Sequence, residues 1–361
     1  MSGRRAMIAM SGGVDSAMAA CLMKEAGYDC TGVMMKLYDS GAGAACSDKS
    51  CCTEEDAQDA RSVAAKLGIP FYVFNFQDEF EDAVIRPFAE SYIRGETPNP
   101  CIDCNRKLKF ERLMRRMKEL EFDYLATGHY ARVEYDPADG RYHLKKGLDE
   151  SKDQSYVLYD LTQEQLAHIK FPLGTRRKAE IRELAQKHGF RNAKKRDSQD
   201  ICFVPDGDYA SFIEKYCGHT FPQGDFISED GRILGTHKGM IRYTIGQRRG
   251  LGVPAPERLY VCRKDPEHNQ IVLGPAKSLG CRVVFADRCS WIGFREDVRT
   301  VRCRAKIRYK HPEAPAVVTR LSDSRMRVEF DEPQRGIAPG QAIVLYDGDE
   351  VLGGGRIEKQ D

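Results

Sequence analysis

The sequence predicts an α/β protein: a parallel, doubly wound sheet followed by a small mixed middle domain and a C-terminal β-barrel. Three observations lead to this prediction. An apolar run, Ala6–Ala9, precedes a glycine-rich turn and a helical stretch, Asp15–Ala26. Strand and helix patterns alternate as far as about residue 130, which is typical of a parallel sheet covered on both faces. From Gly280 onward, short strands separated by turn residues predominate, as in a small barrel.

The bulk properties set the limits for function. The chain has 361 residues, and we place three domains at 1–205, 206–279 and 280–361. Lys and Arg total 56 against 54 Asp and Glu, so a nucleic-acid surface must come from local clusters of charge. There is no apolar run of about 18 residues and no signal-peptide pattern, so we expect a cytoplasmic protein that does not contact membranes.

The elements of the first domain follow from apolar spacing. Strands are expected at Thr31–Leu37, Phe71–Phe76 and Tyr124–Thr127, and helices at Glu54–Leu67, Glu79–Arg94 and from about Arg106. Two prolines predict that Gly95–Asn105 is a loop, free of helix and strand. Residues at helical spacing then form a core stripe: Phe110, Leu113, Met114, Met117 and Leu120. In such a sheet, ligands bind at the carboxyl ends of the strands.

The later elements include the main RNA-binding candidate. A hairpin is expected at Arg132–Leu144 and a helix at Arg176–His188, and three glycines, Gly353–Gly355, should break the last strand. Val301–Lys310 alternates with period two, and every outward position is cationic. A polyanion would relieve the repulsion between these cations, whereas acids from another strand would explain them without RNA. Basic clusters at 106–118 and 176–196 support the RNA interpretation, and the alternative is that each is a solvated helix face.

The turn after the first strand predicts a nucleotide site. Its residues are Met10, Ser11, Gly12, Gly13, Val14, Asp15 and Ser16. A strand, a glycine-rich turn and a helix together direct backbone N–H groups and a helix N-terminus at an anion. The spacing matches neither the common NTPase loop nor the dinucleotide fingerprint. An ordinary tight turn is the alternative.

The cysteines predict thiol or metal chemistry. The chain has 13 of them, and in a long chain without a signal peptide they are not expected to form a disulfide framework. Cys101 and Cys104 form C-x-x-C, which serves zinc sites, redox pairs and clusters alike. Cys202 follows the cationic run Lys194–Arg196, which favours a reactive thiolate. Cys46, Cys51 and Cys52 lie in a loop of small residues. We interpret them as loop thiols without a catalytic role; the alternative is that they are extra sulfur handlers.

Six motifs carry a resemblance to a known family. S-G-G-V-D-S resembles the pyrophosphate loop of the N-type ATP pyrophosphatases, also called PP-loop enzymes. It is followed in order by G-x-T-P-N-P-x-x-x-C-N, A-T-G-H-Y-A-R, S-K-D-Q-S-Y-V-L, D-S-Q-D-I-C-F and I-R-Y-x-H. Together they resemble the bacterial and organellar tRNA-specific 2-thiouridylases, from about residue 7 to residue 357.

The resemblance implies a PP-loop sheet and a reaction. ATP, with Mg²⁺, would adenylate the C2 oxygen of the wobble uridine in a tRNA anticodon loop, and sulfur would replace it. Cys202 would carry the sulfur as a persulfide, and Cys104 would release it and then form a Cys104–Cys202 disulfide. Asp15 would join the catalytic group. A cysteine desulfurase or a sulfur-relay protein would be the donor.

The resemblance also implies individual contacts. Met35 and Gly128 would flank the adenine and ribose, and Asn99, Pro100 and Cys101 would lie beside the target base. The residues matching tRNA-contact positions are His129, Lys152, Asp153, Gln154, Arg308, Tyr309 and Gln341. For His129, which follows a strand end, we prefer this functional role to that of a core histidine.

One departure from the family opens a second mechanism. Cys101 stands where the family usually has an aspartate, so Cys101, Cys104 and Cys202 could hold a [4Fe–4S] cluster with one open position for sulfide. A structural zinc site at these cysteines is a further alternative. Two other functions are weighed: an amide-forming synthetase with the same loop, and a zinc- or cluster-bearing RNA-binding protein without turnover.

Overall fold

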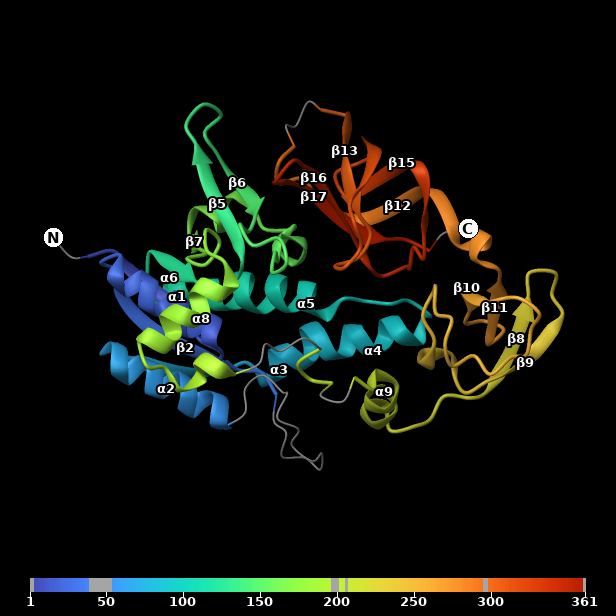
Figure 1. Ribbon diagram of the computed structural model, residues 1–361, viewed down its shortest axis with the longest axis horizontal. Coiled ribbons are helices and arrows are strands. Elements are labelled where there is room, and N and C mark those ends of the chain that lie inside the picture. The colour runs from blue at the N-terminus through green and yellow to red at the C-terminus, as the bar shows by residue number, and fades with distance from the viewer. Residues whose placement is uncertain (1–2, 39–53, 196–200, 205–206, 295–297, 360–361) are drawn as a thin grey trace. The chain divides into compact units, whose positions relative to one another are not determined.

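The computed structural model describes the chain in five stretches: residues 3–38, 54–195, 201–204, 207–294 and 298–359 (Figure 1). The chain forms two compact units. Unit 1 comprises Met1–Val84, Cys101–Gly207 and Gly348–Val351, and unit 2 comprises Ile85–Pro100, Asp208–Asp347 and Leu352–Asp361. Unit 2 therefore contains both the predicted middle domain and the predicted barrel. No helix in the described stretches is both long enough and apolar enough to cross a membrane.

Unit 1 is built on a five-stranded sheet whose strands are all parallel, as predicted. Their order across the sheet is β3 (Phe71–Asn75), β2 (Asp29–Lys36), β1 (Arg5–Ala9), β4 (Tyr124–Ala126) and β7 (Ile169–Lys170). Three helices share one apolar core with these strands: α1 (Val14–Glu25), α2 (Glu54–Leu67) and α8 (Lys178–Lys187). They are the helices labelled beside β2 in Figure 1. The order places the end of β1 next to the ends of β2 and β4.

The remaining elements of unit 1 surround this sheet. They are α3 (Gln77–Phe80), η1 (Glu81–Ile85, which runs into unit 2), β5 (Ala131–Asp136), β6 (Arg141–Lys146), η3 (Ser155–Leu158), α7 (Gln163–Ala167) and η4 (Arg191–Lys194). The predicted hairpin is confirmed, because β5 and β6 pair antiparallel from Ala131 opposite Lys146 to Asp136 opposite Arg141.

The prediction that Gly95–Asn105 is wholly a loop is wrong. Helix α5 (Pro100–Asp103) continues into the π-helical segment η2 (Cys104–Leu113) and then α6 (Met114–Glu119). Proline interrupts a helix only in its interior, and Pro100 occupies the first position, where its missing N–H has no intrahelical partner to lose. Both cysteines of the C-x-x-C motif therefore lie on a helix. The predicted stripe is buried except for Leu120, which follows α6 and is 45% exposed.

Unit 2 contains a four-stranded sheet and a barrel. The small sheet has the order β10 (Tyr260–Asp265), β11 (Gln270–Gly274), β8 (Gly224–Ser228) and β9 (Ile233–His237). Its helical elements are α4 (Arg86–Ile93), α9 (Tyr209–Cys217), η5 (Met240–Arg242) and η6 (Ala276–Leu279). Phe226 and Tyr243 are among the residues of its separate apolar core.

The barrel strands follow the order β12 (Gly280–Ser290), β15 (Arg325–Arg335), β14 (Ala314–Arg320), β13 (Thr300–Lys306), β16 (Ala342–Asp347) and β17 (Glu350–Ile357). Pairing of β12 with β17 closes the predicted barrel. Two details of the prediction are wrong. Strand β13 ends at Lys306, before the last cations of the run. Strand β17 continues through its glycines, which let it pack closely against β12. A Cβ on Gly353 would lie 2.1 Å from the Ser290 carbonyl oxygen of β12.

Candidate active site

The glycine-rich turn connects β1 to α1 and is fixed from within. Its Ser16 hydroxyl accepts a hydrogen bond from the Ser11 N–H at 3.1 Å and donates to the Gly13 carbonyl at 3.0 Å. Gly12 has φ +77°, and a Cβ there would lie 2.5 Å from the Asp56 carbonyl oxygen of α2. Only glycine satisfies both the backbone angle and this close approach. The turn therefore has one defined shape.

The turn suits a phosphate group. Gly13 is the N-cap of α1 and supplies no side chain to bond the first N–H groups of the helix. Among the described residues, a Cβ on Gly13 would meet only the Ser11 hydroxyl, at 3.6 Å, so the backbone at the N-cap is not crowded. The helix N-terminus attracts negative charge there. These features fit the ATP phosphates that the sequence predicts here.

Asp15 is held by two residues that the sequence pattern did not single out. The Lys178 ammonium lies 2.8 and 2.7 Å from its two carboxylate oxygens, and the Tyr130 hydroxyl donates to one of them at 2.8 Å. Lys178 is the first residue of α8, and its side chain is only 9% exposed. The pair joins the start of α1 to the start of α8.

Asn192 and Lys195 brace the turn from the segment after α8. The buried Asn192 amide donates to the Gly12 carbonyl at 2.8 Å. Lys195 pairs with Asp56 and Asp59 of α2, at 2.8 and 3.0 Å. The sequence placed Lys178 and Lys195 in a basic helix suited to RNA, but the structure directs both at carboxylates beside the turn. No local pattern distinguished these residues from solvated lysines.

The other predicted nucleotide-binding residues lie close to the same turn in the fold. Met10, at the start of the turn, and Val14, at the start of α1, are both buried. Met35 is buried near the end of β2. Gly128 follows β4, and a Cβ on it would lie 2.8 Å from the Asp15 carbonyl carbon. The close packing at Gly128 brings the β4 edge against the first turn of α1.

The cysteine helix is anchored by charge. Arg106 bonds Asp103 at 2.6 Å within the helix, and its Nε lies 3.5 Å from the Asp160 carboxylate. Burial raises the pKa of Asp160 to about 6; Arg106 opposes the rise, whereas Asp103 adds to it. Directly before Arg106 in the chain, the buried Asn105 amide donates to the Val157 carbonyl at 3.1 Å. These contacts tie the segment that carries Cys104 to η3.

The three predicted sulfur-handling cysteines all belong to unit 1. Cys101 is exposed, and Cys104 and Cys202 are half-buried. They do not form a group of donor atoms within 4.8 Å anywhere in the described stretches, which does not suit a single zinc ion. Cysteine thiols are also the ligand type of a four-iron cluster, whose sulfurs stand farther apart than those around one ion. Residues 46, 51 and 52 lie outside the described stretches.

Asn99 and Pro100 precede these cysteines directly. Asn99 is half-buried and Pro100 is buried. Both belong to the Ile85–Pro100 segment of unit 2, and Cys101 is the first residue of the next segment of unit 1. The predicted base-contacting residues thus lie at the chain connection between the units.

His129 has the environment of a core histidine. It is buried between the rings of Phe110 and Phe171, at centroid distances of 5.9 and 5.6 Å. Its Nδ1 lies 2.7 Å from the Thr127 hydroxyl. Burial, assisted by Lys109, lowers the pKa of His129 well below its usual range. The imidazole is therefore neutral at pH 7 and does not present a cation to RNA.

The neighbouring residues of the predicted tRNA set stabilise a turn. Asp153 accepts hydrogen bonds from the Gly147 and Ser155 N–H groups, at 3.0 and 3.1 Å. Gln154 accepts a hydrogen bond from the Tyr130 N–H at 3.0 Å, and the hydroxyl of the same tyrosine contacts Asp15. Lys152 is half-buried. Asp153 and Gln154 thus have positioning roles that the sequence did not reveal.

The cationic strand is partly neutralised. Arg302 pairs with Asp331 at 2.5 Å, and Arg304 donates to the Glu313 carbonyl at 2.7 Å and lies 3.8 Å from its carboxylate. These acids come from residues outside the strand, so the alternative of pairing with acids from elsewhere holds for Arg302 and Arg304. Of the predicted tRNA residues in unit 2, Arg308 and Tyr309 are exposed. The third, Gln341, donates to the Thr97 carbonyl at 2.7 Å.

The basic helix at 106–118 is also partly paired with acids. Its contacts are Arg106–Asp103, Lys107–Glu111, Arg116–Glu119 and Lys118–Glu164. Such exposed pairs contribute little to stability, but they reduce the net positive charge that the helix offers to a polyanion.

Comparisons with known proteins cover almost the whole chain. Three family profiles match: a tRNA methyl transferase HUP domain at residues 4–206, a tRNA methyl transferase PRC-barrel domain at 210–275 and an aminomethyltransferase β-barrel domain at 282–357. The tRNA-specific 2-thiouridylase of Geobacter metallireducens is 47% identical over 358 residues, covering 98% of this chain and 97% of that protein. The enzyme of the same name from Moorella thermoacetica is 49% identical, covering 98% and 99%.

Solved structures give more distant matches. The complex of a 4-thiouridine synthetase with RNA and ATP is 17% identical, covering 59% of this chain and 50% of that one, with a TM-score of 0.36. An NMN synthetase from Francisella tularensis is 18% identical, covering 61% and 79%, with a TM-score of 0.34.

Proposed function

We propose that this chain, which belongs to the tRNA-specific 2-thiouridylase family, is an ATP-dependent sulfurtransferase that forms 2-thiouridine at the wobble position of tRNA. The observation that carries the proposal is the turn at residues 10–16. Its open glycine N-cap lies at the carboxyl edge of a parallel sheet, where a nucleotide can bind. The relatives of the same length supply the substrate, because their name specifies thiolation of tRNA.

The first step would be adenylation of the uracil. The backbone N–H groups of Gly12 and Gly13 and the start of α1 would hold the ATP phosphates. The uracil C2 oxygen attacks the α-phosphorus, forming a C–O–P bond as pyrophosphate leaves. Mg²⁺, when bound, would neutralise charge on that leaving group. Asp15, fixed by Lys178 and Tyr130, would keep the first turn of α1 in position while the charge moves.

The second step would deliver sulfur. The terminal sulfur of a Cys202 persulfide attacks C2, forming a C–S bond as AMP leaves with the C–O bond electrons. The Cys104 thiolate then attacks the Cys202 sulfur, so the S–S bond to the base breaks and 2-thiouridine departs. The product enzyme carries a Cys104–Cys202 disulfide, and a thiol reductant and a new sulfur donor restore the persulfide.

The position of Cys104 supports its role as the attacking thiol. It begins a π-helical segment, a form of helix frequently found at functional sites, and the Asp103–Arg106–Asp160 contacts anchor that segment. A second candidate mechanism uses the same three cysteines differently. Cys101, Cys104 and Cys202 would hold a [4Fe–4S] cluster, which would supply an open site for sulfide, and the persulfide would not form.

The test is a thiolation assay with defined cofactors. Protein purified without oxygen and stripped of iron is incubated with ATP, Mg²⁺, a persulfide donor and unmodified tRNA. The nucleosides are then measured by mass spectrometry. We expect 2-thiouridine from the iron-free protein. Thiolation only after cluster reconstitution would replace the persulfide mechanism by the cluster mechanism, and no thiouridine under either condition would overturn the function.

Cysteine variants separate the two mechanisms further. Cys202→Ala should abolish thiolation while tRNA affinity stays within about twofold. Cys101→Asp restores the usual residue of the family, so it should retain activity with a persulfide and lose it with a cluster. Cys217→Ala, at a half-buried cysteine of α9, is the matched control and should behave as wild type. Retained thiolation in Cys202→Ala would remove that residue from the mechanism.

The same assay would distinguish thiolation from the competing functions, because each would give a different result. An amide-forming synthetase would consume ATP without needing any of the three cysteines. A binding protein would retain tRNA yet release neither AMP nor pyrophosphate. The matched profiles are described in terms of methyl transfer, which would add mass to the nucleoside without exchanging oxygen for sulfur. Mass spectrometry distinguishes each of these results from thiolation.

A further inference from the structure

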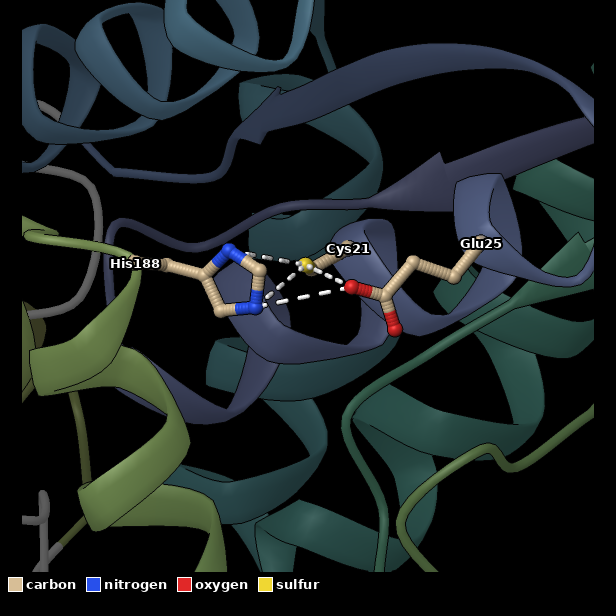
Figure 2. Close-up of side chains that lie close together, drawn as sticks. All are labelled: Cys21, Glu25 and His188. Carbon is tan, nitrogen blue, oxygen red and sulfur yellow. Dashed lines mark hydrogen bonds and ion pairs between the residues drawn. The ribbon is translucent and has the colours of Figure 1, made fainter.

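A cysteine, a glutamate and a histidine meet at the end of α1 opposite to Asp15. Cys21 and Glu25 are one turn apart on α1, and His188 directly follows α8 (Figure 2). The Cys21 sulfur lies 3.5 Å from Glu25 Oε1, and 3.6 and 3.8 Å from Nε2 and Nδ1 of His188. His188 Nε2 and Glu25 Oε1 are 3.5 Å apart, which closes the triangle. We call these three residues the α1–α8 cluster.

The size of this triangle matches the coordination of one zinc ion. Zinc binds sulfur at about 2.3 Å, imidazole nitrogen at about 2.0–2.1 Å and carboxylate oxygen at about 2.0–2.2 Å, in tetrahedral geometry. Those bond lengths place neighbouring ligand atoms roughly 3.3–3.6 Å apart. The three observed separations, 3.5, 3.5 and 3.6 Å, agree with these values. The imidazole ring would have to turn to direct Nε2 at the ion, because Nδ1 lies 3.8 Å from the same sulfur.

The surroundings also favour a cation. The cluster lies at the C-terminal ends of α1 and α8, where the partial charge of a helix is negative. Cys21 is 1% exposed, whereas the His188 and Glu25 side chains are 37% and 55% exposed, so the site is open on one side to solvent.

We propose that Cys21, Glu25 and His188 bind one Zn²⁺ ion, with water at the fourth position. The ion joins the C-terminal ends of α1 and α8. The N-terminal ends of the same two helices are joined by the Asp15–Lys178 pair. Zinc at the cluster is therefore a structural clamp that fixes the spacing of the helices beside the phosphate turn. This proposal concerns residues that take no part in the thiolation chemistry above.

The test measures zinc in the full-length reduced protein. Metal is removed with a chelator, zinc is added, and bound zinc is counted by mass spectrometry after desalting. His188→Gln and Glu25→Gln alter partly exposed side chains and preserve the fold, and Cys21→Ser removes the sulfur. Cys30→Ser is the matched control, because Cys30 is a buried cysteine of the same core outside the cluster. Cobalt is used in parallel, because a thiolate ligand gives it a charge-transfer band.

We expect His188→Gln and Cys21→Ser each to lose one equivalent of zinc relative to wild type, with Glu25→Gln binding more weakly. Cys30→Ser should keep the wild-type count. Zinc at about a hundred times its dissociation constant should raise the melting temperature of wild type by roughly 5–10 °C. Wild-type zinc content in both His188→Gln and Cys21→Ser would overturn the proposal. An equal loss in Cys30→Ser would overturn it as well.

Discussion

The Asp15–Lys178 pair makes a quantitative prediction about the nucleotide turn. Lys178 is buried and approaches both Asp15 oxygens, at 2.8 and 2.7 Å, whereas the Asp15 side chain is 31% exposed. The changes to compare are Asp15→Asn, Lys178→Met and the double variant. Asp15→Asn keeps an oxygen that can accept the Tyr130 hydroxyl but removes the negative charge. Lys178→Met keeps most of the side-chain volume.

The expected cost follows from the unequal burial of the two partners. At this distance the attraction is about 6 kcal/mol with an effective dielectric constant of about 20, and burial of the ammonium offsets most of it. Breaking a fully buried pair costs about 3–5 kcal/mol, and partial exposure of Asp15 reduces this to about 2 kcal/mol for Asp15→Asn. Lys178→Met should cost only about 1 kcal/mol, because Asp15 keeps Tyr130 and solvent.

Hydrogen exchange of α1 and α8 peptides is the assay, because it reports local opening in a chain with two compact units. Asp15→Asn should exchange about thirtyfold faster and Lys178→Met about fivefold faster. Exchange in the double variant should accelerate by much less than the product of these two factors, because that variant no longer buries an ammonium without its carboxylate. Strictly multiplicative effects would refute the reasoning, because they would mean that the two charges do not interact.

Three further predictions concern other parts of the chain. Burial raises the pKa of Asp160 to about 6, so between about pH 4 and pH 6 the folded chain holds a proton there that the unfolded chain has lost. Stability should therefore fall as pH rises through this range. Asp160→Asn should flatten a plot of melting temperature against pH. Gly353→Ala should destabilise the barrel by roughly 2–4 kcal/mol, because the new Cβ would lie 2.1 Å from a β12 carbonyl oxygen, and an unchanged urea midpoint would contradict this. Replacing the exposed Arg308 and Lys310 with Ala should lower the salt dependence of tRNA binding by about two phosphate contacts, whereas Arg302→Ala, which removes an ion-paired cation, should change it less.

The parallel sheet, the hairpin and the barrel could be predicted because each rests on local spacing of apolar residues. The two misplaced elements involve residues whose usual effect depends on position. Proline breaks helices, but Pro100 occupies the first helical position, where it is tolerated. Glycine weakens strands, but the β17 glycines allow the close approach that closes the barrel. In both cases the deciding contact lies outside the local sequence.

The candidate site likewise has one part that the local sequence predicts and another that depends on distant residues. The turn at residues 10–16 is continuous in the chain, so its residue types predict its shape and its affinity for phosphate. Its partner Lys178 comes from 163 residues farther along, inside a run of basic residues. The sequence cannot show which lysine of such a run is buried. For the same reason, His129 was interpreted as a tRNA contact although its neighbours Phe110 and Phe171 enclose it.

The two ends of the α1–α8 helix pair should report on each other. From Asp15 to Glu25, α1 rises about 15 Å, so a zinc ion at the cluster cannot touch the Asp15–Lys178 pair directly. It can act only by restricting how α1 moves against α8. Zinc should therefore slow exchange at the first hydrogen-bonded amides of both helices, those of Ala17 and Ile181, and the slowing should be greater in Lys178→Met, where the pair no longer holds that end. If zinc protected only the amides next to Cys21 and His188, the two helices would be moving independently, and the clamp would not reach the phosphate turn.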